Sequence, residues 1–196
     1  MNYFHYVNDD FWCEDVPVAK IAAEVGTPFY LYSYKTLSQH FQVFDKSFSE
    51  VPHIICFAAK ANSNMAILRT FFLLGGGLDI VSGGELYRAL QAGVDPRKVV
   101  YSGVGKTIAE IKYALASNIL MFNVESSQEL EVINACAGKM DRKADIALRV
   151  NPDVDPETHP HISTGLKENK FGIDVESALS QYRRAKDYNN IKIIGI

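Results

Sequence analysis

The chain has 196 residues, of which 47% are hydrophobic and 22% charged, a composition typical of a globular protein with a sizeable core. Its formal net charge is -3 and its basic residues form no stripe, which argues against a nucleic acid or an anionic membrane as partner. No secretory signal pattern and no apolar stretch long enough to span a bilayer occur in the sequence. Three unpatterned cysteines make a disulfide framework improbable, so we expect a reduced, cytoplasmic protein.

The N-terminal part does not share the rhythm of the remainder. Residues 1–30 are rich in Tyr, Phe and Asp, and the PFYLY run at 28–32 predicts a strand. Apolar side chains recur along one face of residues 34–48, which predicts a helix. We therefore divide the chain into an N-terminal segment, 1–30, and a domain, 31–196. The segment is expected to associate with a part of the protein outside this sequence.

Short apolar runs alternate with helical segments from about residue 54 onward. The runs that predict strands are 54–59, 78–82, 98–102, 120–124, 145–150 and 191–196. The first five begin roughly 20 to 25 residues apart, the size of one βα unit. Strands this apolar are typical of a parallel sheet that is buried on both faces. The fold class is thus α/β, either an open doubly wound sheet or a (β/α) barrel.

The helical segments between these runs carry recognisable ends. Glycines at 75 and 93 fit C-terminal caps, and Asp174 fits the N-cap of a helix that includes residues 178–185. Thr107 with Glu110, and Ser126 with Glu129, each fit a capping box.

Polar side chains collect where the predicted strands end, namely Lys60, Ser82, Ser102, Asn123, Glu125, Arg149 and Asn151. In a barrel the carboxyl ends of all strands converge on one mouth, whereas in an open sheet only those near the switch point meet. This favours a (β/α)8 TIM-type barrel, of which about six βα units are present. Because the final apolar run IKIIGI (191–196) has no cap or following helix, we expect the sequence to be an N-terminal fragment of a longer protein.

Lys60 is the strongest candidate for chemistry. It directly follows an apolar strand, in FAAKANSN (57–64), where small alanines leave room beside the amine. A partly desolvated lysine at a barrel mouth loses its proton more readily and attacks a carbonyl carbon. On position alone a solvated lysine is the commoner case.

Several motifs in order give a specific resemblance. They are FAAKANSN (57–64), GGGLDIVSGGEL (75–86), VVYSGVGKT (99–107), LRVNP (148–152) and NPDVDPETHPHISTGLKENKFGI (151–173). Together they resemble the pyridoxal-phosphate-dependent decarboxylases built on an alanine-racemase-like, fold type III barrel. The last motif is most similar to the diaminopimelate decarboxylases.

The resemblance implies a carboxy-lyase that uses pyridoxal 5'-phosphate to convert meso-2,6-diaminopimelate into L-lysine and CO2, the last step of lysine biosynthesis. Lys60 would hold the cofactor as a Schiff base, with Asp79 and Arg149 as further cofactor-binding residues. Asp79 and Glu85 would orient the lysine and tune its affinity for a proton. Alternatively, Glu85 is a helix first-turn charge and Arg149 an ion pair at the barrel mouth. Ser102 and His159 are possible supporting residues.

The resemblance also implies a homodimer with a C-terminal β domain that the N-terminal segment would join. The family's ring-stacking histidine, glycine-rich phosphate loop and pyridine-nitrogen carboxylate would fall beyond residue 196. We therefore expect the 196-residue chain alone to be inactive.

Other functions are open on the sequence. The nearest is a related decarboxylase acting on a polyamine precursor or arginine, and a further one is a non-catalytic pyridoxal-phosphate-binding homologue. A P-loop at GVGKT (103–107) is disfavoured because the pattern requires glycine at position 100, where Val100 stands. His159 and His161 lack ligand partners at metal-binding spacing, so no metal site is predicted.

Overall fold

The computed structural model describes residues 2–154 and 171–196. The chain forms two compact units, Met1–His53 and Ile54–Ile196. No helix among the described residues is long and apolar enough to cross a membrane.

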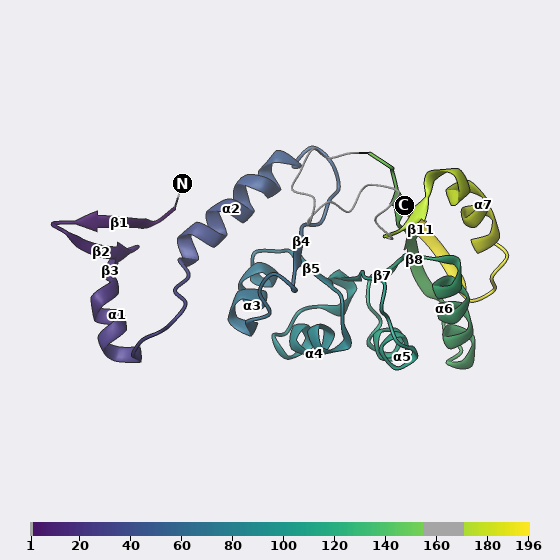
Figure 1. Ribbon diagram of the computed structural model, residues 1–196, viewed down its shortest axis with the longest axis horizontal. Coiled ribbons are helices and arrows are strands. Elements are labelled where there is room, and N and C mark those ends of the chain that lie inside the picture. The colour runs from purple at the N-terminus through teal and green to yellow at the C-terminus, as the bar shows by residue number, and fades with distance from the viewer. Residues whose placement is uncertain (1, 155–170) are drawn as a thin grey trace. The chain divides into compact units, whose positions relative to one another are not determined.

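The first unit contains a small antiparallel sheet and two helices (Figure 1). Its elements are β1 (Phe4–Val7), β2 (Asp10–Cys13), β3 (Val16–Pro17), α1 (Val18–Val25) and α2 (Tyr34–Ser47). The strands pair in the order β1-β2-β3. Helix α2 confirms the predicted helix at 34–48. The strand predicted at 28–32 is wrong: no described strand pairs with this segment, and Tyr30 is 90% exposed.

Two side chains hold the start of α2 through hydrogen bonds, those of its N-cap Ser33 and of Glu14. Ser33 is the N-cap, and its hydroxyl accepts a hydrogen bond from the Thr36 amide. The Glu14 carboxylate accepts from the Ser33 hydroxyl and from the Lys35 amide, each at 2.8 Å. These contacts lower the pKa of Glu14, chiefly through the Lys35 amide.

The second unit is an alternation of strands and helices. Its main strands are β4 (Cys56–Ala58), β5 (Gly77–Ile80), β6 (Val99–Tyr101), β7 (Met121–Val124), β8 (Ala144–Leu148) and β11 (Ile191–Gly195). Its α-helices are α3 (Met65–Leu73), α4 (Gly83–Gln91), α5 (Ile108–Ser117), α6 (Ser127–Lys139) and α7 (Val175–Ala185). A 3-10 turn, η1 (Pro96–Lys98), precedes β6, and β9 (Val150–Asn151) pairs with β10 (Ile173–Asp174). All six predicted strands are present, shifted by a residue or two.

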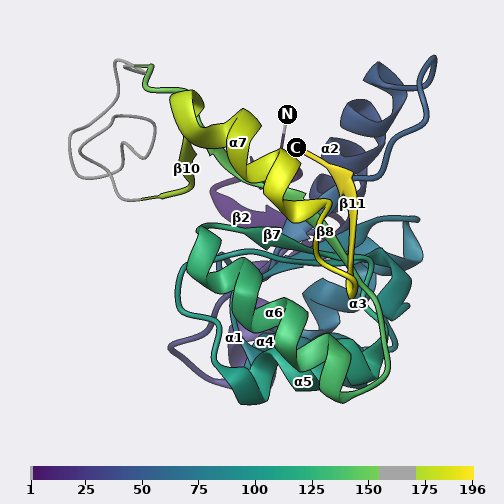
Figure 2. The same ribbon diagram turned by 90° about the vertical axis from the view of Figure 1, so that its right-hand side faces the viewer.

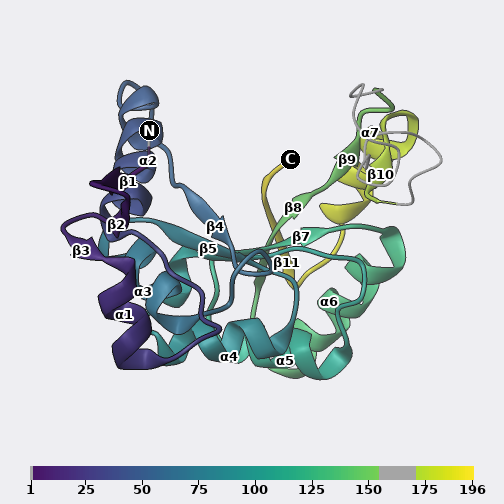
Figure 3. The same ribbon diagram turned by 60° about the vertical axis from the view of Figure 1, so that its left-hand side comes forward.

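The six strands form one parallel sheet in chain order, β4-β5-β6-β7-β8-β11. Helices α4, α5 and α6 lie together on one side of the strands in both turned views (Figures 2 and 3). A doubly wound sheet would instead reverse its strand order and carry helices on both faces. The sequential order is that of a (β/α) barrel, so the six strands form part of such a barrel.

The alternation of side chains along each strand separates a core from a cavity face. On β7, Phe122 and Val124 belong to the buried core between strands and helices, whereas Met121 and Asn123 face a cavity. On β5, Ile80 is fully buried in that core, and its neighbour Asp79 faces the cavity. The alternation along each strand thus places Asp79 and Asn123 on the inner face.

The helix ends follow the predicted caps with one exception. Thr107 and Glu110 form a complete capping box, and the Asp174 side chain accepts from the Ser177 amide. Ser126 caps α6, but the Glu129 carboxylate does not return to the Ser126 amide. That part of the second capping-box prediction is wrong, because Glu129 Oε2 accepts from the preceding amide, Glu125, at 2.7 Å while its Oε1 binds Lys106.

Candidate active site

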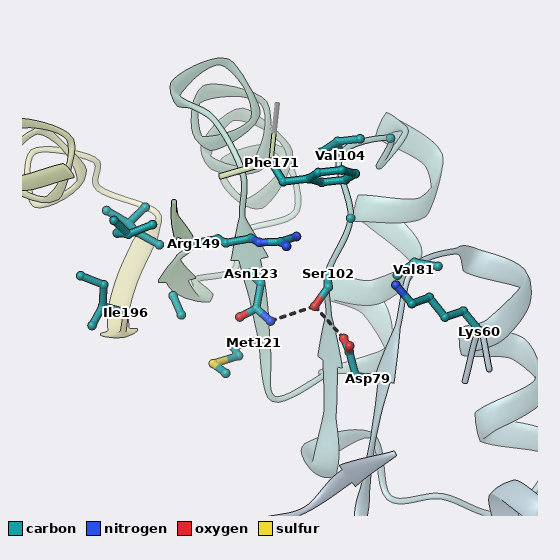
Figure 4. Close-up of a pocket in the computed structure, with 15 residues that line it drawn as sticks. Lys60, Asp79, Val81, Ser102, Val104, Met121, Asn123, Arg149, Phe171 and Ile196 are labelled. Carbon is teal, nitrogen blue, oxygen red and sulfur yellow. Dashed lines mark hydrogen bonds between the residues drawn. The ribbon is translucent and has the colours of Figure 1, made fainter. Parts of the chain in front are cut away.

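A cavity of about 720 Å³ opens at the carboxyl ends of the strands of the second unit (Figure 4). Its polar lining comes from five different strand ends, and its apolar lining includes Val81, Met121, Ala147 and Ile196. The polar and charged residues are Lys60, Asp79, Ser102, Asn123 and Arg149. Of the seven strand-end residues predicted to converge, Lys60, Ser102, Asn123 and Arg149 line this cavity, whereas Ser82, Glu125 and Asn151 do not.

Lys60 lies just after β4 and lines the cavity. The amide of the preceding residue, Ala59, donates to the Asp79 carbonyl at 2.9 Å, which extends the β4–β5 pairing to the residue before the lysine. Lys60 itself is exposed, so the partial desolvation expected from the sequence is not found. The reason is its place after β4, which has a partner strand on one side only among the described residues.

A row of hydrogen bonds crosses three neighbouring strands on the cavity face. The Ser102 hydroxyl donates to Asp79 Oδ1 at 2.6 Å, and Asn123 Nδ2 donates to the Ser102 oxygen at 2.9 Å (Figure 4). Because the amide supplies the donor to Ser102, the serine proton points to the carboxylate. The row therefore presents Asp79 as an acceptor with a fixed orientation.

Arg149 follows β8 and brings a permanent positive charge to the cavity. Its Nη1 donates to Glu125 Oε1 at 2.8 Å, and its guanidinium carbon lies 5.2 Å from the centre of the Phe171 ring. The Glu125 side chain is 3% exposed, against 37% for Arg149. The ion pair considered from the sequence exists, and it leaves Arg149 at the cavity wall.

Lys106, in the GVGKT run, has a fully buried side chain. Its ammonium donates to the carbonyls of Gly103 and Asn123 and to Glu129 Oε1, at 2.7, 2.9 and 2.6 Å. All three protons of the ammonium are thus used within the protein. Lys106 thereby links the chain at the ends of β6 and β7. Its ammonium has no hydrogen-bond donor left for a nucleotide phosphate.

The remaining predicted site residues lie beside the cavity or outside the described chain. Glu85 sits in the first turn of α4, where its Oε2 accepts from the Val81 amide at 2.7 Å. Glu85 thereby holds Val81, which follows β5 and lines the cavity. His159 lies outside the described residues.

Three residues that shape the site have no role predicted from the sequence. Asn123 and Glu125 are predicted only to be polar residues at a strand end, and Phe171 falls only within a motif. Strand alternation is a signal for Asn123, because it shares the inner face with Met121. No local signal identifies the contacts of Glu125 and Phe171 with Arg149, which join residues 24 and 22 positions apart.

Comparison with known proteins gives the same picture. The family described as "Pyridoxal-dependent decarboxylase, pyridoxal binding domain" matches residues 34–196. A diaminopimelate decarboxylase from Vibrio cholerae is 54% identical over 197 residues, covering 100% of this chain and 47% of that protein. The one from Haemophilus influenzae is 53% identical, with the same coverage. The chain thus spans about half the length of the curated relatives it matches.

Solved structures are similar over nearly the whole chain. The diaminopimelate decarboxylase from Helicobacter pylori complexed with L-lysine has a TM-score of 0.87 and 44% identity, covering 90% of this chain and 45% of that one. The enzyme from M. jannaschii in co-complex with L-lysine has a TM-score of 0.87 and 38% identity, covering 98% and 46%. These matches confirm the resemblance, the barrel fold and the cofactor read from the motifs. The chain belongs to the pyridoxal-dependent decarboxylases and carries their pyridoxal binding domain.

Proposed function

We propose that the whole protein carrying this chain decarboxylates meso-2,6-diaminopimelate to L-lysine and CO2, with pyridoxal 5'-phosphate attached to Lys60. The observation that carries the proposal is an accessible lysine amine at a polar cavity, in a chain 54% identical to a diaminopimelate decarboxylase. Relatives crystallised with L-lysine support the product.

The residues of the cavity fit this cofactor. A cavity of about 720 Å³ lies within the usual range for small-molecule sites. The primary amine of Lys60 matches the cofactor's aldehyde, and the Arg149 guanidinium matches its anionic oxygens. Asp79, fixed by Ser102, supplies a carboxylate acceptor on the same face.

When bound, pyridoxal phosphate supplies the electron sink that takes up the electron pair released as CO2 departs. The protein's own groups position and protonate. Lys60 would hold the cofactor covalently through Nζ, and its freed amine would deliver the one proton that replaces the departing carboxylate on the reacting carbon. The Asp79 carboxylate would orient a positively charged group of the bound ligand near the strand ends. The Arg149 guanidinium would hold an anionic oxygen of the ligand.

Assay of the whole protein with meso-diaminopimelate, ornithine and arginine tests this function. We expect lysine and CO2 from diaminopimelate, and a fall in kcat of about 10²–10⁴-fold or more for Lys60→Ala, the range for loss of a positioned proton-transfer group. Lys112→Ala, which changes an exposed lysine on α5, is the matched control and is expected to keep its activity. Turnover of ornithine or arginine alone would replace the substrate assignment, and turnover of none of the three would favour a non-catalytic homologue.

We further propose that the whole protein is a homodimer in the cytoplasm. The dimer rests on the family resemblance. The compartment is supported by three free cysteines, at 13, 56 and 136, which suit a reducing environment. A monomeric sedimentation coefficient, or recovery of the protein outside the cytoplasmic fraction, would contradict the respective assignment.

A further inference from the structure

Glu125 is a buried carboxylate that joins three separate parts of the barrel rim. It follows β7 and precedes Ser126, the N-cap of α6. Its Oε1 accepts from Arg149 Nη1 at 2.8 Å and from the Gly103 amide at 3.1 Å. Its Oε2 accepts from the Gly172 amide at 3.0 Å. One side chain thus ties together the chain after β6, the end of β8 and the segment leading into β10.

The segment 171–173 closes on Arg149 from the other side. The Phe171 ring lies 5.2 Å from the guanidinium carbon, and the Ile173 amide donates to the Arg149 carbonyl at 2.8 Å. Gly172 has φ of +80°, and a Cβ there would stand 2.9 Å from the same carbonyl oxygen. Only glycine allows so close an approach. The FGI end of the long motif therefore has a physical role, which is to cover Arg149.

We propose that Glu125 is a positioning residue for the cavity reaction: together with Phe171 and Gly172 it holds the Arg149 guanidinium in one orientation at the cavity. This proposal rests on the proposed function. The held guanidinium binds an anionic oxygen, either of the cofactor or of the substrate carboxylate. Figure 4 shows Arg149 extended below Phe171 and above Asn123, toward the space that Lys60 also borders.

The chemistry of the Glu125–Arg149 ion pair explains why a buried carboxylate can hold the guanidinium in one orientation. An arginine side chain that is 37% exposed has many rotamers, and an orientation suited to one ligand oxygen is lost without a partner. A carboxylate hydrogen bond to guanidinium is charge-assisted and directional, and cation–π contact with an aromatic ring fixes the plane. Two backbone amides on Glu125 compensate its burial and keep the acceptor itself in place.

The test uses the whole protein and the variant Glu125→Gln, which keeps the shape but removes the charge and presents an amide donor to one of the three partners. We expect the dissociation constant of pyridoxal phosphate, measured by absorbance titration, or the KM for the amino-acid substrate to rise about tenfold or more. A rise in the first constant identifies the cofactor as the source of the anionic oxygen, and a rise in KM alone identifies the substrate. Glu110→Gln is the control, because Glu110 also bridges two neighbouring loops, through the Gly83 amide, but away from Arg149.

A coupling measurement separates positioning from general stability. We expect Glu125→Gln to change these constants less than about twofold in the Arg149→Gln background, since a positioning residue acts only through its partner. If thermal melting shows that Glu125→Gln is unfolded, Phe171→Leu is measured in its place. We expect the same rise in the dissociation constant of pyridoxal phosphate or in KM, and the same loss of that effect in the Arg149→Gln background. The inference would be overturned if the folded variant kept the wild-type dissociation constant and KM. It would also be overturned if the variant raised them as much in the Arg149→Gln background as in the wild-type protein. Failure of the wild-type protein to bind pyridoxal phosphate would instead overturn the proposed function.

Discussion

Ser102 is the central residue of the row Asp79, Ser102 and Asn123, because it is both donor and acceptor. The three come from consecutive strands and meet only when the strands pair in register. That Ser102 lies at the site was predictable, because it is a polar residue at the end of a predicted strand. The direction of each hydrogen bond was not, because it depends on which neighbour supplies the proton.

Replacing Ser102 by alanine leaves Asp79 Oδ1 and Asn123 Nδ2 without this partner. We expect the free energy of unfolding to fall by about 0.5–1.5 kcal/mol for each hydrogen bond lost, the usual net contribution of such a contact. Urea unfolding of the whole protein measures it. Ser127→Ala, which removes only a contact to the adjacent Gln128, is expected to change stability by less than about 0.5 kcal/mol. Equal effects of the two changes would rule out a structural role for the row.

Helices and strands were largely predictable because their signals are local. Apolar runs of five or six residues gave the six strands, and the pattern of Thr107 and Glu110 gave a complete capping box. Two predictions are wrong. The 28–32 run is apolar enough for a strand but lacks a partner strand among the described residues. The Glu129 carboxylate is occupied by the Glu125 amide at Oε2 and by Lys106, from the loop before α5, at Oε1, and only the second contact is non-local.

Glu110 provides a pH test at the level of an element. Hydrogen bonds from the Gly83 and Thr107 amides hold its pKa below the usual 4.5. A lowered folded pKa means that the contribution is present above the unfolded value and is lost as pH falls through the folded one. We therefore expect Glu110→Gln to destabilise the protein more at pH 7 than at pH 3. Chemical unfolding of both proteins at the two pH values measures this, and an equal difference at both would contradict it.

At the scale of the whole molecule, the barrel determines which distant residues meet. Chain-order strands bring Lys60, Asp79, Ser102 and Arg149 to one cavity. The meeting of Lys60, Ser102 and Arg149 was predictable from the βα rhythm and the polar strand ends, whereas Asp79 was expected there only from the family resemblance. The setting of Arg149 was not predictable. It depends on a return of the chain from residue 171 onto a strand that ends 23 residues earlier, and such a contact leaves no periodic signal in the sequence.

The central claim is that Lys60 carries the cofactor at this cavity. Reduction of the whole protein with borohydride in the presence of pyridoxal phosphate, followed by peptide mass spectrometry, tests it most directly because reduction fixes the cofactor on its lysine. We predict a single modified lysine, Lys60, in the peptide around FAAKANSN. Modification of another lysine with Lys60 unmodified, or no site-specific modification at all, would contradict the account.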